Sequence, residues 1–146
     1  MNIAFFLKPK HEIAYLYDTY TIRQALEKMH HHGYTAIPVI TDDGKYAGTV
    51  GEGDFLWYLV QGEGGEPIQQ TDIQKTEKMK LADLPFAGRY EPVSITATIE
   101  QLMDKAITQN FVPVVDDLGS FIGIVTRQDI IRYFYSQYAD RSPKKE

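Results

Sequence analysis

The chain has 146 residues and a mass of 16.7 kDa, the size of one ordinary globular domain. Its residues are 43% hydrophobic and 12% aromatic, enough for a packed core, which excludes disorder as the main state. The absence of cysteine excludes a disulfide scaffold and thiol catalysis, and the net charge of −5 argues against a nucleic-acid-binding surface. No apolar run reaches the roughly 20 residues of a membrane helix. Because the first seven residues do not resemble a secretory signal, we expect a cytoplasmic protein.

An internal repeat organises the sequence. Pro38 and Pro113 lie in similar apolar runs 75 positions apart, and this shift pairs identical residues at 8 of the 22 positions from Pro38 to Leu59. Upstream of the prolines the shift becomes 77, which pairs Thr21 with Thr98. The chain therefore contains two copies of one unit.

Each copy predicts the element order β-α-β-β-α. In the first copy the expected elements are a strand at 13–17, a helix with apolar positions Ile22, Ala25, Leu26 and Met29, strands at 36–40 and 46–50, and a helix from 53–54 onward. In the second copy they are a strand at 92–95, a helix with Ile99, Leu102, Met103 and Ala106, strands at 111–115 and 121–125, and a helix from 128–129 onward. Thr21 and Thr98 are expected to cap the first helices, and Gly33 and Asn110 to end them in the left-handed conformation.

The residues between the copies are expected to form a connector at 61–88. Its first part, residues 61–67, has the composition of a flexible loop, whereas Leu81, Leu84 and Phe86 are expected to anchor its end. The charged tail at 139–146 is expected to be loose. Because one copy cannot bury both faces of its sheet, we expect the two copies to pack together and to form clefts between them.

The repeat resembles a known sequence motif. The second copy, from Phe111 through Asp129, resembles a CBS motif, and the first copy resembles it in the run from Gly33 to Val39, the turn at 43–44 and the Asp that opens the next helix. The resemblance spans about residues 10–137. It implies an α/β (α+β) fold of tandem β-α-β-β-α CBS repeats with pseudo-twofold symmetry. The whole chain, 1–146, would be one stand-alone CBS pair, a Bateman module of the bacterial type, with motifs at 10–60 and 89–138.

The resemblance also implies a function without catalysis, namely binding of AMP, ADP or ATP in a cleft between the copies and signalling to a partner protein. An aspartate such as Asp129 can accept hydrogen bonds from ribose hydroxyls, Thr126 offers a hydroxyl beside free helix amides, and Arg127 or Arg132 can contact phosphate. In the family the base slot comes from the other copy. The candidate nucleotide-binding residues are Ala14, Tyr34, Thr35, Ala36, Ile37, Pro38, Thr126, Arg127, Gln128 and Asp129.

A second candidate site follows from the pseudo-symmetry. It consists of Asp54, Tyr90, Phe111, Val112 and Pro113 beside Gly51, Glu52 and Gly53. Here Gly51 replaces a hydroxyl residue, Glu52 would repel phosphate, and Phe111 is bulkier than its counterpart Ala36.

The first copy also resembles a subgroup of CBS proteins that bind cyclic di-AMP. Tyr34-Thr35-Ala36 and Thr126-Arg127 match that subgroup, whereas Glu12 and Gln128 stand where basic residues are expected. The mononucleotides are therefore the first prediction, and cyclic di-AMP is the alternative.

Other interpretations remain open at this point. Asp54 and Asp129 can be simple helix caps, Arg127 can be a solvated surface residue, and the chain can be a dimeric interaction module without a ligand. Three consecutive histidines, 30–32, point in different directions on a helix, so we expect no metal and no cofactor. An aromatic surplus on the last helix of each copy predicts a homodimer, and the downstream partner is not identified by the sequence; these aromatics are Trp57, Tyr58, Tyr133, Phe134, Tyr135 and Tyr138.

Overall fold

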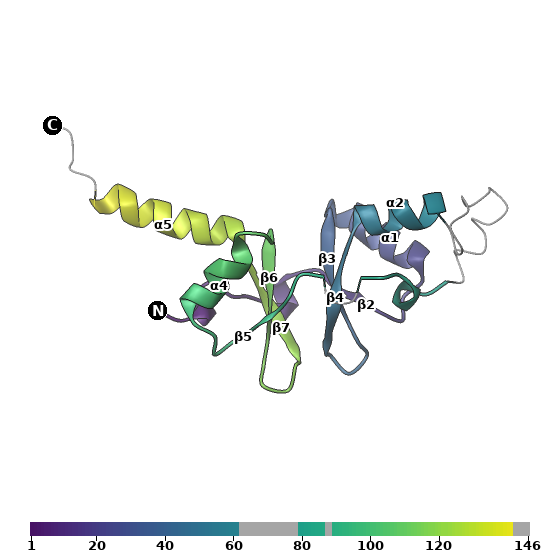
Figure 1. Cartoon of the computed structure of the whole chain (residues 1–146), viewed down its shortest axis with the longest axis horizontal. Coiled ribbons are helices and arrows are strands. Elements are labelled where there is room, and N and C mark those ends of the chain that lie inside the picture. The colour runs from purple at the N-terminus through teal and green to yellow at the C-terminus, as the bar shows by residue number, and fades with distance from the viewer. Residues whose placement is uncertain (62–78, 87–88, 142–146) are drawn as a thin grey trace. The chain divides into compact units, whose positions relative to one another are not determined.

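The computed structural model describes residues 1–61, 79–86 and 89–141 (Figure 1). These residues form two compact units. Unit 1 consists of Met1–Ile13, Tyr90–Leu118 and the chain from Ile122 onward, and unit 2 consists of Ala14–Arg89 and Gly119–Phe121. Each unit thus holds one copy of the repeat together with the segment that precedes the other copy.

Unit 2 is built around a three-stranded sheet with the order β2-β3-β4. Strand β2 runs parallel to β3, and β3 runs antiparallel to β4 with a register shift between Val39 and Ile40. The described elements are β2 (Leu16–Tyr17), α1 (Ile22–His32), β3 (Ala36–Ile40), β4 (Tyr46–Gly51), α2 (Glu52–Gln61) and the short 3-10 helix η3 (Leu81–Asp83).

Unit 1 is built around a four-stranded sheet with the order β1-β7-β6-β5. Its outer strands pair with the hairpin in opposite ways, because β1 is antiparallel to β7 and β5 is parallel to β6. The described elements are η1 (Ile3–Phe5), β1 (Lys8–Pro9), η2 (Lys10–Glu12), β5 (Val93–Ser94), α4 (Ile99–Ala106), β6 (Phe111–Val115), β7 (Phe121–Thr126) and α5 (Arg127–Arg141).

The predicted order β-α-β-β-α is confirmed in both copies, and the largest differences lie at element ends. The strand predicted at 13–17 is only Leu16–Tyr17, and the strand predicted at 92–95 is only Val93–Ser94. Helix α5 continues through Arg141, into the segment predicted to be a loose tail. The predicted loop after Gln61 and the last residues, 142–146, lie outside the described residues.

The predicted N-caps are confirmed. Thr21 accepts a hydrogen bond from the Gln24 amide and Thr98 accepts one from the Gln101 amide, and each glutamine side chain bonds back to its threonine amide. Gly33 ends α1 with φ 69, as predicted. The equivalent prediction for Asn110 is wrong, because the only described non-glycine residue with positive φ is Tyr90.

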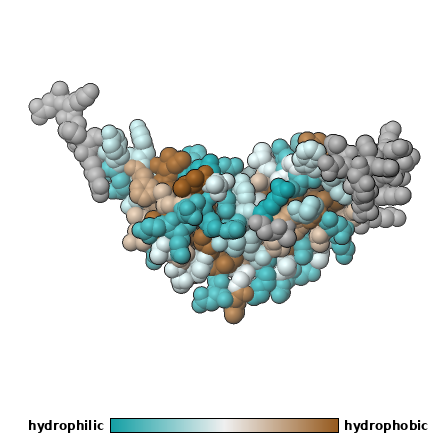
Figure 2. Space-filling view, in the orientation of Figure 1, coloured by the Kyte–Doolittle hydropathy of each residue, from teal (hydrophilic) through white to brown (hydrophobic). Residues whose placement is uncertain are grey.

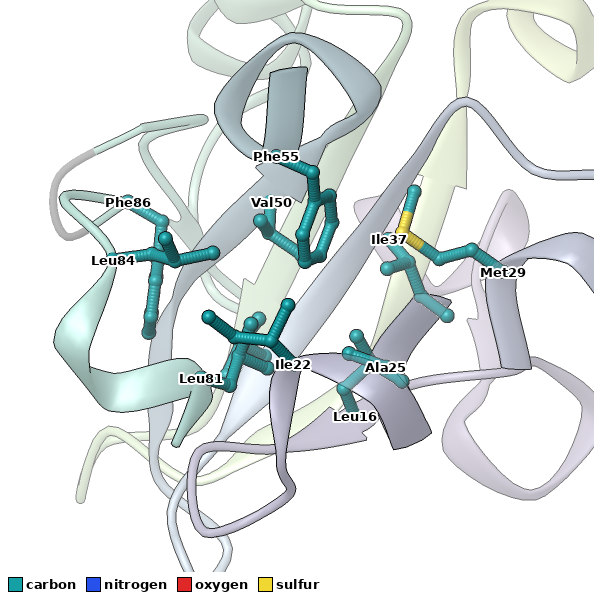
Figure 3. Packing of buried hydrophobic residues seen from close by; sticks show 11 residues of the cluster. Leu16, Ile22, Ala25, Met29, Ile37, Val50, Phe55, Leu81, Leu84 and Phe86 are labelled. Atoms are coloured by element: carbon teal, nitrogen blue, oxygen red, sulfur yellow. The ribbon is translucent and has the colours of Figure 1, made fainter. Parts of the chain in front are cut away.

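Unit 2 closes its core with the end of the connector. Figure 3 shows Leu81, Leu84 and Phe86 packed beside Ile22 and Phe55, and all five side chains are buried. The prediction that this part of the connector is anchored is therefore confirmed. It supplies the face that the three short strands and two helices cannot cover with their own side chains.

Unit 1 closes its core with the N-terminal segment, which the repeat did not predict. Ile3 and Phe6 are buried together with Leu102, Val112 and Val114. The equivalent helix positions Leu26 and Met103 are 38% and 37% exposed, so each predicted apolar stripe reaches the surface at its edge.

Close approach of two backbones fixes the N-terminal segment on the sheet. Strand β1 pairs Lys8 with Ile124 and Pro9 with Gly123. A Cβ atom at Gly123 would collide with the Lys8 carbonyl oxygen and would lie 2.9 Å from Leu7 Cδ1. A glycine is therefore required where β1 crosses β7.

We predict that Gly123→Ala lowers the free energy of unfolding by about 1–3 kcal/mol, because the added methyl group must displace β1. Hydrogen exchange of residues 3–9 should accelerate in the same variant. Gly53→Ala is the matched control, since a Cβ at Gly53 meets no atom within 4 Å. Equal stability of Gly123→Ala and the wild type in denaturant titration would contradict the assignment.

Candidate functional site

The junction between β7 and α5 carries four of the predicted ligand-binding residues, 126–129, in one turn of chain. Thr126 caps α5 by accepting a hydrogen bond from the Asp129 amide at 3.1 Å. This contact uses an oxygen lone pair, so the hydroxyl proton of Thr126 can still be donated to an acceptor.

The Asp129 carboxylate is accessible and is balanced by a base from the N-terminal segment. Lys8 Nζ lies 3.4 Å from Asp129 Oδ2, and the two side chains are 46% and 26% exposed. An exposed pair of this kind contributes little to stability and is screened by solvent. Asp129 can therefore exchange Lys8 for a ligand hydroxyl at small cost.

Arg127 has a structural role that the sequence did not predict. Its Nε donates to the carbonyl of Ala106 at 2.8 Å and its Nη2 to the carbonyl of Ile107 at 3.3 Å. Both carbonyls lie at the end of α4. In the first copy the equivalent helix, α1, ends in the turn at Gly33. A side chain from the next helix thus replaces the left-handed residue, which is the reason Asn110 does not need positive φ.

A hollow of about 620 Å³ lies at the start of α5 within unit 1. Phe111, which the sequence assigned to the second candidate site, lines it together with Thr126 and Gln128 of the first. Two arginines contribute positive charge and no acidic residue lines it, so the hollow suits an anion. Its lining residues are Asn110, Phe111, Thr126, Arg127, Gln128, Ile131 and Arg132.

The equivalent junction of unit 2 reverses the capping arrangement. Because Gly51 has no side chain, the carboxylate of Asp54 turns back and accepts the Gly51 amide at 2.7 Å. The other oxygen of Asp54 lies 3.0 Å from Arg89 Nη1, and the Asp54 side chain is only 3% exposed. Both carboxylate oxygens are engaged within unit 2.

Unit 2 also contains a hollow, of about 370 Å³, and its charge is different. Glu52 lines it at the sequence position equivalent to Arg127, so a phosphate is disfavoured there. The remaining lining residues are Leu26, Met29, His30, Gly33 and Tyr34.

The first-copy residues predicted to form the base slot all belong to unit 2. Tyr34 and Thr35 are exposed and Ala14 and Ala36 are half-buried, whereas Ile37 and Pro38 are buried in the sheet. The carbonyl of Thr35 accepts the Glu52 amide at 2.9 Å, just as the carbonyl of Asn110 accepts the Arg127 amide. In both copies, the residue before the first hairpin strand therefore accepts a hydrogen bond from the first residue of the following helix, α2 or α5.

The second-copy residues predicted for the other base slot are packed within unit 1. The rings of Tyr90 and Phe111 lie 4.8 Å apart, and Val112 and Pro113 are buried in β6. Sequence reasoning missed Lys8 and Arg89, the partners of the two helix-start aspartates. Lys8 precedes the motif predicted at 10–60, and Arg89 is the first residue of the motif predicted at 89–138, where no role was assigned to it.

A cluster of tyrosines lies beside Ala14. Lys28 Nζ donates to the Tyr15 carbonyl at 2.7 Å and lies 5.4 Å from the centre of the Tyr15 ring. Burial raises the pKa of Tyr15, and Tyr17 and Tyr20 add to the increase. The phenol therefore stays protonated at neutral pH.

The histidine run forms ring contacts. His32 stacks on Tyr34 with ring centres 5.4 Å apart, and His31 meets His32 edge to face. Within residues 1–61, 79–86 and 89–141, no three His, Cys, Asp or Glu side chains are grouped as metal ligands would be. None of the helices in the same residues has the length and apolar character needed to cross a membrane.

Comparison with known proteins identifies the family. The CBS domain family matches residues 7–61 and 89–136, so the chain belongs to the CBS domain family.

Solved structures resemble most of the chain. The structure of CbpB in complex with cyclic di-AMP has a TM-score of 0.84 and 25% identity, over 96% of this chain and 88% of that one. The structure of CBSX2 in complex with AMP has a TM-score of 0.73 and 25% identity, over 94% and 98% of the two chains. An uncharacterised protein of Methanopyrus kandleri is 28% identical over 78% of this chain. The chain spans about half the length of the curated relatives it matches.

We predict that Arg127→Gln lowers the free energy of unfolding by about 1–2 kcal/mol without any ligand, because the end of α4 loses charged donors. Arg132→Gln is the matched control, since Arg132 is exposed on the same helix and should leave stability within about 0.5 kcal/mol. The measurement is urea denaturation of both variants. If the two variants prove equally stable, Arg127 does not hold α4.

Proposed function

We propose that this chain is one CBS pair with motifs at 10–60 and 89–138 joined by the connector 61–88, and that it is a non-enzymatic regulatory module for an adenine nucleotide. The observation that carries the proposal is the start of α5. There an accessible carboxylate, a capping hydroxyl and an arginine-lined hollow lie within unit 1.

Each of these groups has a counterpart in a nucleotide. Asp129 accepts hydrogen bonds from the two ribose hydroxyls after Lys8 moves aside. Thr126 donates its hydroxyl proton to a phosphate oxygen, and Arg132 adds a charge-assisted contact.

The proposed base slot uses first-copy residues that pair a rigid backbone with open side chains. Pro38 and Ile37 fix the strand, and the small side chains of Ala14 and Ala36 allow a flat base to approach the backbone. The accessible Tyr34 and Thr35 support this assignment. A similar protein was solved with AMP, which agrees with this class of ligand.

Cyclic di-AMP is the second candidate. The hollow is lined by Thr126 and, further along α5, by Ile131 and Arg132, and we place the rest of the dinucleotide there. A similar protein with 25% identity was solved with cyclic di-AMP. Glu12 and Gln128 stand where basic residues are expected for cyclic di-AMP, so the mononucleotides remain the first candidates.

The proposed output is a change that a separate cytoplasmic protein recognises. A ligand that binds one conformation of the chain more tightly than another shifts the population toward that conformation. A partner protein that prefers the same conformation then binds more tightly when the ligand is present. An interaction module without a ligand is the competing interpretation, and titration separates the two.

We predict that isothermal titration of nucleotide-free protein detects binding of at least one of AMP, ADP, ATP and cyclic di-AMP. Asp129→Asn should weaken that binding about tenfold to hundredfold, because hydrogen bonds to a charged acceptor contribute about 1.5–3 kcal/mol. Arg132→Gln should also weaken binding, because the variant loses the charge-assisted phosphate contact assigned to Arg132.

Asp117→Asn is the matched control for Asp129→Asn, since Asp117 is an exposed carboxylate in the β6–β7 turn. Its affinity should equal that of the wild type. Absence of heat with all four ligands would favour the ligand-free module. An equal loss of nucleotide affinity in Asp129→Asn and Asp117→Asn would show that Asp129 does not bind the ligand directly.

We propose that the chain forms a homodimer through α2 and α5. In Figure 2 hydrophobic surface gathers over the first part of α5. Large exposed side chains on these helices support an interface, since tyrosine and tryptophan are favoured there. These side chains are Leu56, Trp57, Ile131, Phe134, Tyr135 and Tyr138.

We predict that light scattering gives about twice the 16.7 kDa of one chain, and that Tyr135→Glu shifts the protein to monomer by placing a charge in the interface. Leu118→Glu is the matched control, because Leu118 is 77% exposed in the β6–β7 turn and belongs to neither helix. A monomeric wild type, or a Tyr135→Glu variant that stays dimeric, would exclude this interface.

A further inference from the structure

The two helix-start aspartates occupy equivalent positions in the repeat, yet their surroundings differ. Asp129 is 26% exposed and is paired to a lysine at 3.4 Å, whereas Asp54 is 3% exposed and has an arginine nitrogen at 3.0 Å and a backbone amide at 2.7 Å. Asp54 therefore has no oxygen left unbonded for a ribose diol unless the arginine moves.

The backbone of Arg89 is held by hydrogen bonds at both its amide and its carbonyl. Its amide donates to the Phe86 carbonyl at 3.1 Å, and its carbonyl accepts the Tyr46 hydroxyl at 3.0 Å. Tyr46 is itself fixed by a 2.7 Å hydrogen bond with Thr49. Phe86 is buried in the core of unit 2, so the backbone of Arg89 is anchored to that core.

The residue directly after this anchor has an unusual backbone conformation. Tyr90 has φ 56, a left-handed conformation that is unfavourable for a non-glycine residue. Such a conformation persists where surrounding contacts compensate for it. Here the core anchor, the Tyr46 hydrogen bond and the Asp54 ion pair all act on the preceding residue.

We infer that Arg89 is a built-in counter-ion which occupies the ribose-binding capacity of Asp54, so that the chain offers one adenine-nucleotide site rather than two. This inference rests on the proposed function and specifies its stoichiometry. Glu52 disfavours phosphate at the same junction, and the Tyr90 and Phe111 rings pack on each other at 4.8 Å. The second set of residues is thus used for structure, and the site at Asp129 is the one that responds to ligand.

The test counts adenosine bound per chain by equilibrium titration. Adenosine is the probe because it has the ribose but no phosphate for Glu52 to repel. The expected count is one for the wild type and two for Arg89→Ala, and Arg89→Ala combined with Asp54→Asn should return it to one. Arg23→Ala is the matched control, because Arg23 is an exposed arginine of unit 2 paired with Glu27, and it should bind one equivalent.

Arg89→Gln provides a second variant if Arg89→Ala does not fold, since its neutral amide can still bond to Asp54 and a ribose can displace it. A wild type that binds two equivalents would overturn the inference, as would arginine variants with the wild-type count. A wild type that binds none would defeat the proposed function at Asp129. The inference would still be decided in that case by whether the Arg89 variant gains one equivalent.

Discussion

The fold depends on one constraint, which is that neither copy of the repeat can cover its own sheet. In unit 1 the cover is the N-terminal segment, whose strand β1 lies against Gly123 and whose Ile3 and Phe6 enter the core. In unit 2 it is the end of the connector, with Leu81, Leu84 and Phe86. The N-terminal segment precedes the first copy but covers the second, and the end of the connector precedes the second copy but covers the first. Removal of either segment would therefore expose the core of the copy that it does not directly precede.

The same two segments determine the electrostatics of the helix-start aspartates. The N-terminal segment brings Lys8 to Asp129, and Arg89, the residue directly after the connector, pairs with Asp54. The first pair is solvent-exposed and exchangeable, whereas the second has a buried carboxylate, and breaking it would leave that charge uncompensated. Two positions that are identical in the repeat thus acquire different chemistry. One is suited to a ligand, and the other holds the connector on unit 2.

Most of the fold could be predicted from the sequence because the repeat carries local signals that act alone. The capping threonines, Gly33 and the two hairpin turns each specify a short stretch of backbone, and the structure confirms them. The packing of the N-terminal segment on the second copy could not be predicted, because residues 1–9 have no counterpart in the repeat. For the site, the sequence identified Asp129 and Thr126 but not Lys8 or Arg89, and it could not show that Arg127 bonds to the end of α4. These roles depend on long-range contacts rather than on local pattern.

Hydrogen–deuterium exchange with and without a saturating adenine nucleotide tests the difference between the two junctions most directly. Backbone amides are reporters at both places, since each helix start has amides that a bound phosphate or a stiffened cap would protect. The account predicts slower exchange at residues 126–130 and unchanged exchange at residues 51–55. Protection at 51–55 that equals or exceeds protection at 126–130 would contradict it, because the ligand would then be using the junction that Arg89 is inferred to close.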